Sequence, residues 1–160
     1  MLSVVIPCLN EEAAIGPCLE KILSSDVAGE VIVVDGGSAD GTLLAAEKFG
    51  VRIITGSAGR GAQLAMGAKQ ATGSWLLFIH ADTKPGPGWA TVVRRFIEKP
   101  DNRFRAGYFR FALEDTSPAA RRLEKMVDWR CRIFSLPYGD QGLLINAEFY
   151  ESLGGFPKIP

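Results

Sequence analysis

The chain has 160 residues, with 18 lysines and arginines balanced by 18 aspartates and glutamates, so its formal charge is zero. A neutral chain lacks the basic surface typical of nucleic-acid-binding proteins, and no segment reaches the roughly 20 apolar residues of a membrane span. The hydrophobic share of 47% is ordinary for one globular domain that is long enough to bury a core.

The amino terminus and the cysteines both favour a cytoplasmic protein. No basic stretch precedes the apolar residues 2–6, so we expect no signal peptide. Cys8, Cys18 and Cys131 are odd in number and lack the spacing of metal ligands. Free thiols in a reducing cytoplasm are the simplest interpretation.

The first part of the chain alternates between apolar runs and helical patterns. Runs with the length of a buried strand are found at residues 2–6, 30–34, 51–55 and 75–79. Helical patterns follow the first three runs, and Asn10 is expected to cap the first helix. This alternation predicts an α/β fold with a mainly parallel sheet, helices on both faces and right-handed crossovers.

The pattern changes beyond residue 83. Helical spacing is found at 89–98 and from 118 toward 134, whereas residues 104–113 alternate like a strand or a hairpin arm. In the helix that begins at Pro118, arginines interleave with apolar residues, which favours a solvated face beside a core face over a membrane-surface helix. A short strand at 143–145 and a helical turn at 147–153 complete the expected elements.

Four loops follow the four predicted parallel strands, at residues 7–11, 35–42, 56–61 and 80–83. Because the strands are parallel, these loops lie at one edge of the sheet, where α/β proteins bind their ligands. Together they predict a nucleotide-sized site in which Asp82 is an oxygen ligand for a divalent cation. The alternative is that Asp82 caps the next helix and His80 is a structural histidine.

Residues 59–64, Gly-Arg-Gly-Ala-Gln-Leu, imitate a dinucleotide fingerprint, with Asp82 in the place of the ribose-binding acid. However, Leu64 stands where the third glycine belongs, and the unit is the third in the chain rather than the first. A nicotinamide site would also leave Asp35 and its neighbouring glycines unexplained. The pattern therefore argues against a nicotinamide enzyme.

Several motifs carry a resemblance to a known family. Residues 3–7 (SVVIP) with Asn10-Glu11, and residues 33–38 (VVDGGS) with 40–42 (DGT), resemble the family 2 glycosyltransferases of the GT-A fold. Similar motifs of one bacterial subgroup, labelled radical-SAM and selenodomain-associated transferases, are found at 59–64 with Gly67, 80–83, 138–142 and 154–157. The resemblance covers essentially the whole chain and implies a single, Rossmann-like GT-A domain over residues 1–160.

The resemblance implies a set of nucleotide-binding residues, namely Pro7, Asn10, Glu11, Asp35, Gly59, Arg60, Ala81 and Asp82. Asp35 is then expected to accept a hydrogen bond from the base, usually uracil, whereas Asp40 caps the next helix. Arg60 either reaches the diphosphate as a fixed cation or is a solvated arginine in a glycine loop.

The resemblance also implies a divalent cation, Mn²⁺ or Mg²⁺. Asp82 matches the last acid of the family's metal-binding Asp-x-Asp, and His80 stands where the first acid usually is. Histidine ligates Mn²⁺ but suits Mg²⁺ less well. This departure leaves the identity of the metal open.

The mechanism implied by the family is a single inverting displacement, in which a base deprotonates an acceptor hydroxyl. The usual base is an acid of a Glu-Asp pair shortly after a Gly-Gly-Phe segment. Gly154-Gly155-Phe156 is present, but no such pair precedes Pro160, so we expect a C-terminal truncation. Asp140 is the late-loop carboxylate that could replace the base, the alternative being a contact with the acceptor or the donor sugar.

The expected function is therefore a hexosyltransferase-type enzyme that uses a nucleotide-diphospho-sugar, with UDP as the favoured nucleotide. Residues 1–100 form the nucleotide-binding half and residues 101–160 the acceptor half, where Tyr138 and Gln141 contact the acceptor or the donor sugar. The acceptor, a lipid or a small molecule, is open, as is peripheral membrane contact. Two alternatives are a sugar-1-phosphate nucleotidyltransferase, whose glycine-arginine loop normally follows the first strand, and a non-catalytic nucleotide-binding module.

Overall fold

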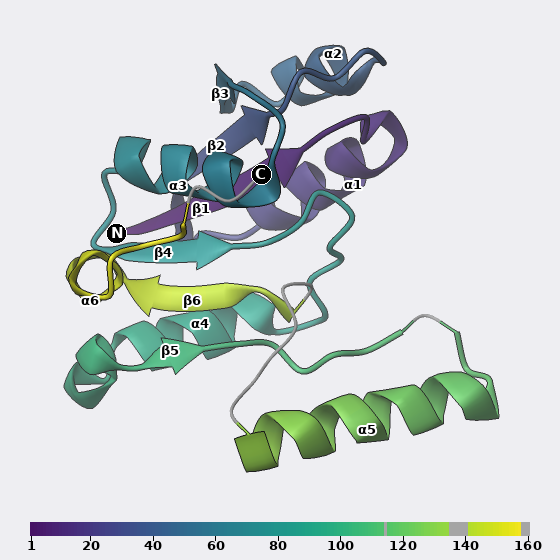
Figure 1. Ribbon diagram of the computed structural model, residues 1–160, viewed down its shortest axis with the longest axis vertical. Coiled ribbons are helices and arrows are strands. Elements are labelled where there is room, and N and C mark those ends of the chain that lie inside the picture. The colour runs from purple at the N-terminus through teal and green to yellow at the C-terminus, as the bar shows by residue number, and fades with distance from the viewer. Residues whose placement is uncertain (114, 135–140, 158–160) are drawn as a thin grey trace.

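The structure, a computed structural model, describes residues 1–113, 115–134 and 141–157 (Figure 1). In chain order its elements are β1 (Leu2–Cys8), α1 (Glu12–Leu23), β2 (Ala28–Asp35), α2 (Thr42–Glu47), β3 (Arg52–Thr55), α3 (Arg60–Gln70), β4 (Trp75–Phe78), α4 (Trp89–Ile97), the 3-10 helix η1 (Pro100–Phe104), β5 (Ala106–Gly107), α5 (Pro118–Phe134), β6 (Leu143–Asn146) and α6 (Ala147–Ser152).

The strands form one sheet in the order β3-β2-β1-β4-β6-β5. β1 pairs in parallel with β2 and β4, and β2 pairs in parallel with β3. The expected α/β fold with a mainly parallel sheet is therefore confirmed. β6 runs antiparallel to β4, and β5 runs antiparallel to β6, so the second half of the chain adds a mixed edge.

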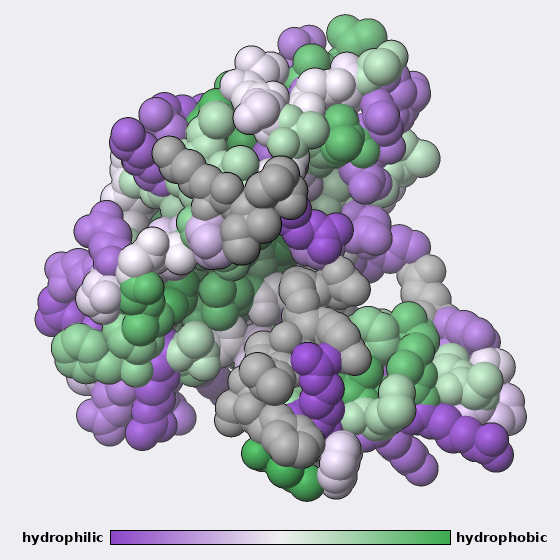
Figure 2. Space-filling model, viewed as in Figure 1, coloured by the Kyte–Doolittle hydropathy of each residue, from purple (hydrophilic) through white to green (hydrophobic). Residues whose placement is uncertain are grey.

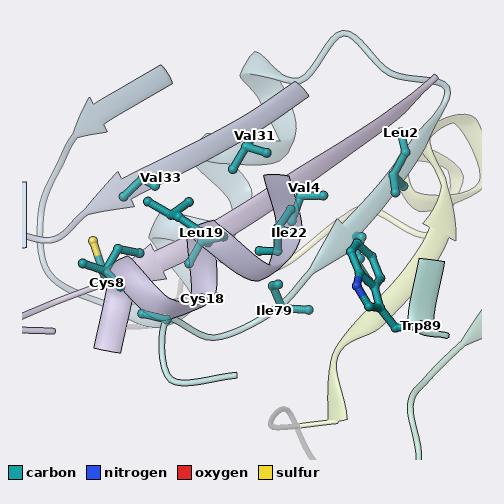
Figure 3. Close-up of a cluster of buried hydrophobic side chains, with 14 of the residues drawn as sticks. Leu2, Val4, Cys8, Cys18, Leu19, Ile22, Val31, Val33, Ile79 and Trp89 are labelled. Carbon is teal, nitrogen blue, oxygen red and sulfur yellow. The ribbon is translucent and has the colours of Figure 1, made fainter. Parts of the chain in front are cut away.

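Both faces of the parallel part are covered, which explains why its strands are unbroken apolar runs. Alternate residues of each strand point to opposite faces. Val4, Ile6 and Val33 pack with α1, α2 and α4 in one core cluster, part of which Figure 3 shows. Val5 and Val34 pack with α3 and α6 in a second cluster on the other face.

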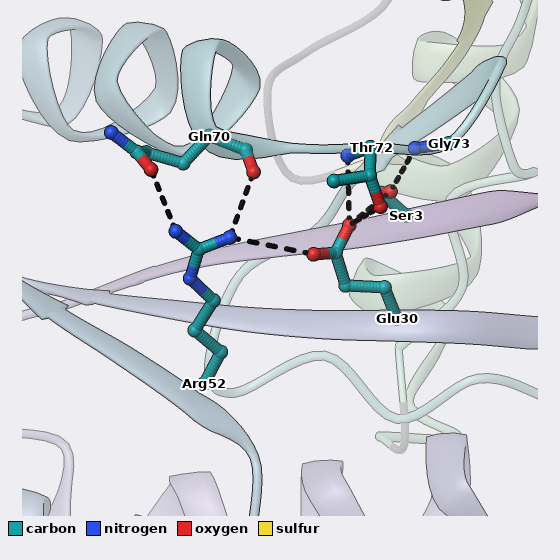
Figure 4. A network of polar contacts seen from close by, with 6 residues as sticks. All are labelled: Ser3, Glu30, Arg52, Gln70, Thr72 and Gly73. Carbon is teal, nitrogen blue, oxygen red and sulfur yellow. Dashed lines mark hydrogen bonds and ion pairs between the residues drawn. The ribbon is translucent and has the colours of Figure 1, made fainter.

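The amino ends of the strands are held together by a polar network around Glu30 (Figure 4). Its carboxylate accepts hydrogen bonds from Ser3 Oγ at 2.6 Å and from the Thr72 backbone N–H at 3.0 Å, and it pairs with Arg52 at 3.6 Å. Burial raises the pKa of Glu30, but these hydrogen bonds and the Arg52 charge outweigh it and lower the pKa. The network fixes the end of the sheet that is opposite to the polar loops.

The region expected as a strand at 104–113 is mostly not a strand. Residues 100–104 form η1 instead, and only Ala106 and Gly107 pair with β6. Past Gly107 the contact continues as single hydrogen bonds, from the Phe109 N–H to the Gln141 carbonyl and from Gln141 Nε2 to the Phe109 carbonyl. The expectation was wrong because alternation specifies a strand only where a long partner strand exists, and β6 is short.

Helix α5 has the bounds expected from the sequence, 118–134, and a buried face formed by Ala120, Glu124, Val127 and Cys131. The rest of the α5 surface is not purely polar. Exposed apolar side chains are also present, at Leu123, Met126, Trp129 and Ile133. Figure 2 shows apolar side chains gathered where α5 lies in Figure 1. Among the described helices, none combines the length and the apolar character needed to cross a bilayer.

Candidate functional site

A pocket of about 280 Å³ opens where the carboxyl ends of β1 and β4 meet the amino end of α3. It is lined by Pro7, Cys8, Leu9, Glu11, Arg60, Gln63, His80, Ala81 and Asp82. The arrowheads of β1, β2 and β4 point the same way in Figure 1, so their following loops share one edge. The structure thus brings together three of the four loops that the sequence places in one site.

Three residues expected in the pocket are not among those that line it: Asn10, Asp35 and Gly59. Gly59 lies immediately before α3 with φ of 133°, a backbone conformation that favours glycine. Gln141 is buried, donates to the Phe109 carbonyl and contacts Cys131 Sγ at 3.3 Å. Tyr138 and Asp140 lie outside the described residues, so their expected contacts stay predictions.

Asp35 is 1% exposed, and its carboxylate is used within its own loop. Oδ2 accepts hydrogen bonds from the backbone N–H groups of Gly37 at 2.9 Å and Ser38 at 3.0 Å, while Oδ1 accepts from Ser38 Oγ and Cys8 Sγ. Burial raises the pKa of Asp35, but the hydrogen bonds from Ser38 and Gly37 outweigh it, so the pKa is lowered. The expected contact with a base would require these bonds to rearrange, and it stays a prediction.

Asn10 does not cap the first helix, contrary to the expectation from its position. α1 begins at Glu12 without a side-chain cap, and Asn10 has φ of 57°. Its Oδ1 accepts from the Ala39 N–H at 2.8 Å, and its own N–H donates to Ser38 Oγ at 2.9 Å. The side chain is instead a link between the loop after β1 and the loop after β2.

The same two loops are joined at the first turns of α1 and α2. Asp40 is not the N-cap of α2 as expected, because the N-cap is Gly41 and the helix has no side-chain cap. Asp40 precedes this residue and accepts from the Thr42 N–H at 3.0 Å and from the Glu12 N–H at 3.1 Å. Glu12 in turn accepts from the Gly41 N–H, and Thr42 Oγ1 accepts from the Glu11 N–H at 2.7 Å. Each loop satisfies backbone donors of the other, so one wall of the pocket is held rigidly.

The segment after β4 forms a tight turn. The His80 N–H donates to Thr83 Oγ1 at 3.1 Å, and the Thr83 N–H donates to the His80 carbonyl at 3.1 Å. α4 begins only at Trp89, after Gly88 and without a side-chain cap. Asp82 therefore does not cap the next helix; it is exposed and lines the pocket beside His80.

Two cysteines lie close to the pocket, Cys8 in its lining and Cys18 in contact with the lining residue His80. Burial, with a smaller effect of Asp35, raises the pKa of Cys8 to about 12, and burial together with Asp82 raises that of Cys18 to about 12. Cys18 Sγ donates to the His80 carbonyl at 3.6 Å. Both are free thiols that stay protonated near neutral pH, so neither is an activated nucleophile.

The donor set of the pocket suits a shared cation rather than a structural metal. Among the described residues, no group of three or more His, Cys, Asp or Glu side chains could hold an ion. Asp82 offers a hard carboxylate and His80 an imidazole within one turn. This set fits a Mn²⁺ or Mg²⁺ ion that takes its remaining ligands from water and from a bound diphosphate.

Sequence reasoning missed the role of Gln63. The residue is buried in the first turn of α3, and its Nε2 donates to the carbonyls of Cys8 and Val34, each at 2.8 Å. It therefore joins the carboxyl ends of β1 and β2 at the floor of the pocket. The sequence does contain a signal for this role, because Gln63 is a long polar side chain directly before the buried residue Leu64.

The chain matches the model of glycosyl transferase family 2 over residues 3–147. It belongs to this family. The family membership agrees with the parallel sheet and with the pocket at the carboxyl ends of its strands. The glycine-arginine loop follows β3 and not β1, and this position argues against the nucleotidyltransferase alternative.

Two curated relatives illustrate the similarity. Glycosyltransferase AglE of Haloferax volcanii is 34% identical over 170 residues, which cover 98% of this chain and 56% of AglE. A PGL/p-HBAD biosynthesis glycosyltransferase of Mycobacterium tuberculosis is 41% identical over 90 residues, covering 51% of this chain and 35% of the relative. The chain thus spans about half the length, or less, of these relatives.

Among solved structures, the fold is similar to that of glucosyl-3-phosphoglycerate synthase from Mycobacterium tuberculosis. The crystal structure of that enzyme with Mn²⁺, UDP and glucosyl-3-phosphoglycerate has a TM-score of 0.69 and 23% identity, covering 92% of this chain and 57% of the enzyme. A crystal structure with Mg²⁺ and UDP has the same TM-score. At this level of identity the likeness shows the fold, which is the expected GT-A fold.

Proposed function

We propose that the chain provides the donor-binding part of a glycosyltransferase that moves a sugar from a UDP-sugar to an acceptor by metal-assisted inverting displacement. The observation that carries the proposal is the pocket of a family 2 chain in which Pro7, Arg60 and Asp82 meet at the carboxyl edge of the sheet. This edge is where α/β sheets bind nucleotides.

The residues of the pocket suit the parts of a nucleotide diphosphate. Asp82, assisted by His80, would hold a divalent cation, and such a cation would offset the negative charge of the diphosphate. Arg60 lies at the start of α3 in the same pocket, where a guanidinium can pair with phosphate oxygens. Pro7 and Glu11 come from the loop that the Asn10 and Asp40 contacts hold in place.

UDP and Mn²⁺ are the ligands of choice for a first test, because the similar glucosyl-3-phosphoglycerate synthase was crystallised with both. The chain's own donor set supports Mn²⁺ as well, since His80 is a better ligand for Mn²⁺ than for Mg²⁺. Arg60 and Asp82 of the pocket are proposed to bind the donor, so the test measures the binding of UDP rather than the transfer of a sugar.

Two finer assignments are part of the proposal. Membership of the radical-SAM and selenodomain-associated subgroup is supported by the motifs at 59–64, 80–83 and 154–157. A cytoplasmic location is supported by the three buried free cysteines, which oxidising compartments rarely keep.

Calorimetric titration of UDP in the presence of Mn²⁺ tests the proposal. The wild-type chain should bind UDP, and Asp82→Asn should weaken binding by at least about tenfold, because the cation loses the carboxylate that the proposal assigns to it. Asp101→Asn is a matched control, since Asp101 is an exposed aspartate of η1. Absence of heat from the folded wild type, or unchanged binding by Asp82→Asn, would contradict the proposal.

A further inference from the structure

The large apolar side chains exposed on α5 lie on one face of the helix. Leu123, Met126, Trp129 and Ile133 are between 41% and 57% exposed, and they recur every three or four residues. Residues at this spacing share one side of a helix. Large apolar side chains that gather on one exposed face mark an interaction surface, whereas scattered ones do not.

Another side of α5 is already in contact with the chain. Ala120, Val127 and Cys131 are buried there. Glu124 is buried beside them, and its carboxylate accepts a hydrogen bond from the Leu113 N–H at 2.8 Å. Successive helical residues are rotated by about 100°, which separates these buried positions from the exposed apolar ones. The apolar face is therefore turned away from the contacts that hold α5 to the chain.

α5 is basic, although the chain as a whole is neutral. The helix contains five basic residues and two acidic ones, so its net charge is +3. Glu124 is buried and pairs with Arg121 at 2.6 Å, and Asp128 is half-buried. Arg122 and Lys125, in contrast, are exposed and border the apolar face. Among the described side chains of α5, the exposed ones thus combine apolar surface with positive charge and include no carboxylate.

This combination fits a membrane surface better than a protein partner. A helix that lies in the bilayer interface has apolar and aromatic side chains on one face, with lysines and arginines beside them. Tryptophan, present here as Trp129, is enriched at the boundary between lipid and water. Protein interfaces are instead poor in lysine. A second copy of the chain, packed symmetrically on this face, would set two positive surfaces against each other.

We propose that the exposed face of α5 docks on the surface of a bilayer that contains anionic lipids. Its apolar side chains enter the boundary between headgroups and acyl chains, and Arg122 and Lys125 pair with lipid phosphate groups. The helix then lies in the plane of the membrane surface. The inference goes beyond the proposed donor binding and does not depend on it, because the described residues that line the donor pocket lie outside α5.

Tryptophan fluorescence with vesicles tests the contact. Of the three tryptophans, Trp75 and Trp89 are each 7% exposed, whereas Trp129 is 57% exposed, so a change in emission reports mainly on Trp129. Vesicles of phosphatidylcholine with about 30% phosphatidylglycerol should shift the emission to shorter wavelength, and pure phosphatidylcholine should bind at least about tenfold more weakly. No binding to the anionic vesicles, or equal binding to both compositions, would overturn the inference.

Two matched pairs of variants assign the binding to α5. Ile133→Ala should weaken binding to the anionic vesicles by at least about fivefold, and Leu44→Ala, at a 68% exposed leucine of α2, by less than about twofold. Arg122→Gln should weaken it about fivefold, and Lys48→Gln, at the end of α2, by less than about twofold. α2 and α5 lie at opposite ends of the molecule (Figure 1). Equal effects within either pair would overturn the inference.

Light scattering without vesicles tests the rival occupant, which is a second copy of the chain. The proposal predicts that Ile133→Ala leaves the mass of the particle in solution unchanged, and that dilution leaves the tryptophan emission unchanged. A dimer that Ile133→Ala dissociates would assign the face to the second copy and would overturn the inference.

Discussion

The two halves of the chain are held together in different ways. In residues 1–100, the strands are buried on both faces, and polar networks fix both ends of the sheet, around Glu30 at one end and around Asp35 and Asp40 at the other. In residues 101–157, β5 contains only two residues, and α5 combines a narrow buried face with exposed apolar side chains. The contrast indicates that the first half is fixed by internal packing and polar networks, whereas less of the described second half is.

The largest expected effect separates a core leucine of the first half from an exposed leucine of the second half. Leu77 is 1% exposed in the central strand β4, whereas Leu123 on α5 is 41% exposed. Leu77→Ala should lower the free energy of unfolding by about 3 kcal/mol, because it leaves a cavity in a packed core. Leu123→Ala should change it by less than about 0.5 kcal/mol. Urea denaturation followed by circular dichroism measures both, and equal losses would contradict the comparison.

A slightly smaller effect is expected where α3 approaches the sheet. A Cβ added at Gly67 would lie 2.3 Å from Val5 Cγ1 and 3.0 Å from Val34 Cγ2. Gly67→Ala should therefore destabilise the fold by about 1–3 kcal/mol, since the helix must move away from β1 and β2. Gly86→Ala is the control, because a Cβ there meets nothing within 4 Å. A Gly67→Ala protein as stable as Gly86→Ala would show that α3 packs less closely than described.

The link between the first two loops should contribute less. Asn10→Ala removes the acceptor for the Ala39 N–H and places alanine at φ of 57°, which together should cost about 1 kcal/mol. Asn10→Gly keeps the backbone freedom and isolates the loss of the hydrogen bond. Thermal unfolding compares the two variants; a larger loss in Asn10→Gly than in Asn10→Ala would contradict the role assigned to the backbone conformation.

The smallest effect is the dependence of stability on pH. The pKa values of Glu30 and Asp35 are lowered in the folded chain below their ordinary values of 4.5 and 3.8. The unfolded chain therefore binds protons first as the pH falls, so the stabilisation is fully present above these ordinary values and is lost as the pH falls through the folded pKa values.

Removal of the hydroxyl partners tests this dependence. Ser3→Ala removes a donor to Glu30, and Ser38→Ala removes one to Asp35. Each variant should show a shallower loss of stability with acid than the wild type does. Denaturation midpoints measured between neutral pH and about pH 3 give the comparison, and an unchanged acid profile in both variants would exclude these two carboxylates as its source.

The strands of the first half could be predicted from the sequence because each one is a short, continuous apolar run. The apolar runs at 2–6, 30–34, 51–55 and 75–79 all became strands of the parallel sheet, and three of their loops met in one pocket. The orientation of Asn10 and Asp35 was not predictable in this way. Asn10 accepts from Ala39, which is 29 residues away, and such a contact exists only in the folded chain. Asp35 accepts mainly from Gly37 and Ser38 of its own loop, and these bonds depend on how that loop turns.

The second half was less predictable because its elements depend on distant partners. The alternation in 104–113 satisfied a strand pattern, but β6 offers pairing only to Ala106 and Gly107. Gln63 shows the same limit within the first half. Its motif indicated a loop that opens a helix, whereas its bonds to Cys8 and Val34 exist only once β1, β2 and α3 are in place.

The central claim is that the pocket between β1, β4 and α3 binds a nucleotide diphosphate through a cation at Asp82. A crystal structure of the chain with UDP and Mn²⁺, with the metal located by its anomalous scattering, tests it most directly. The account predicts Mn²⁺ in contact with the Asp82 carboxylate and UDP bound in the same pocket. Mn²⁺ and UDP bound away from Asp82, outside the pocket that Pro7, Arg60 and Asp82 line, would contradict it.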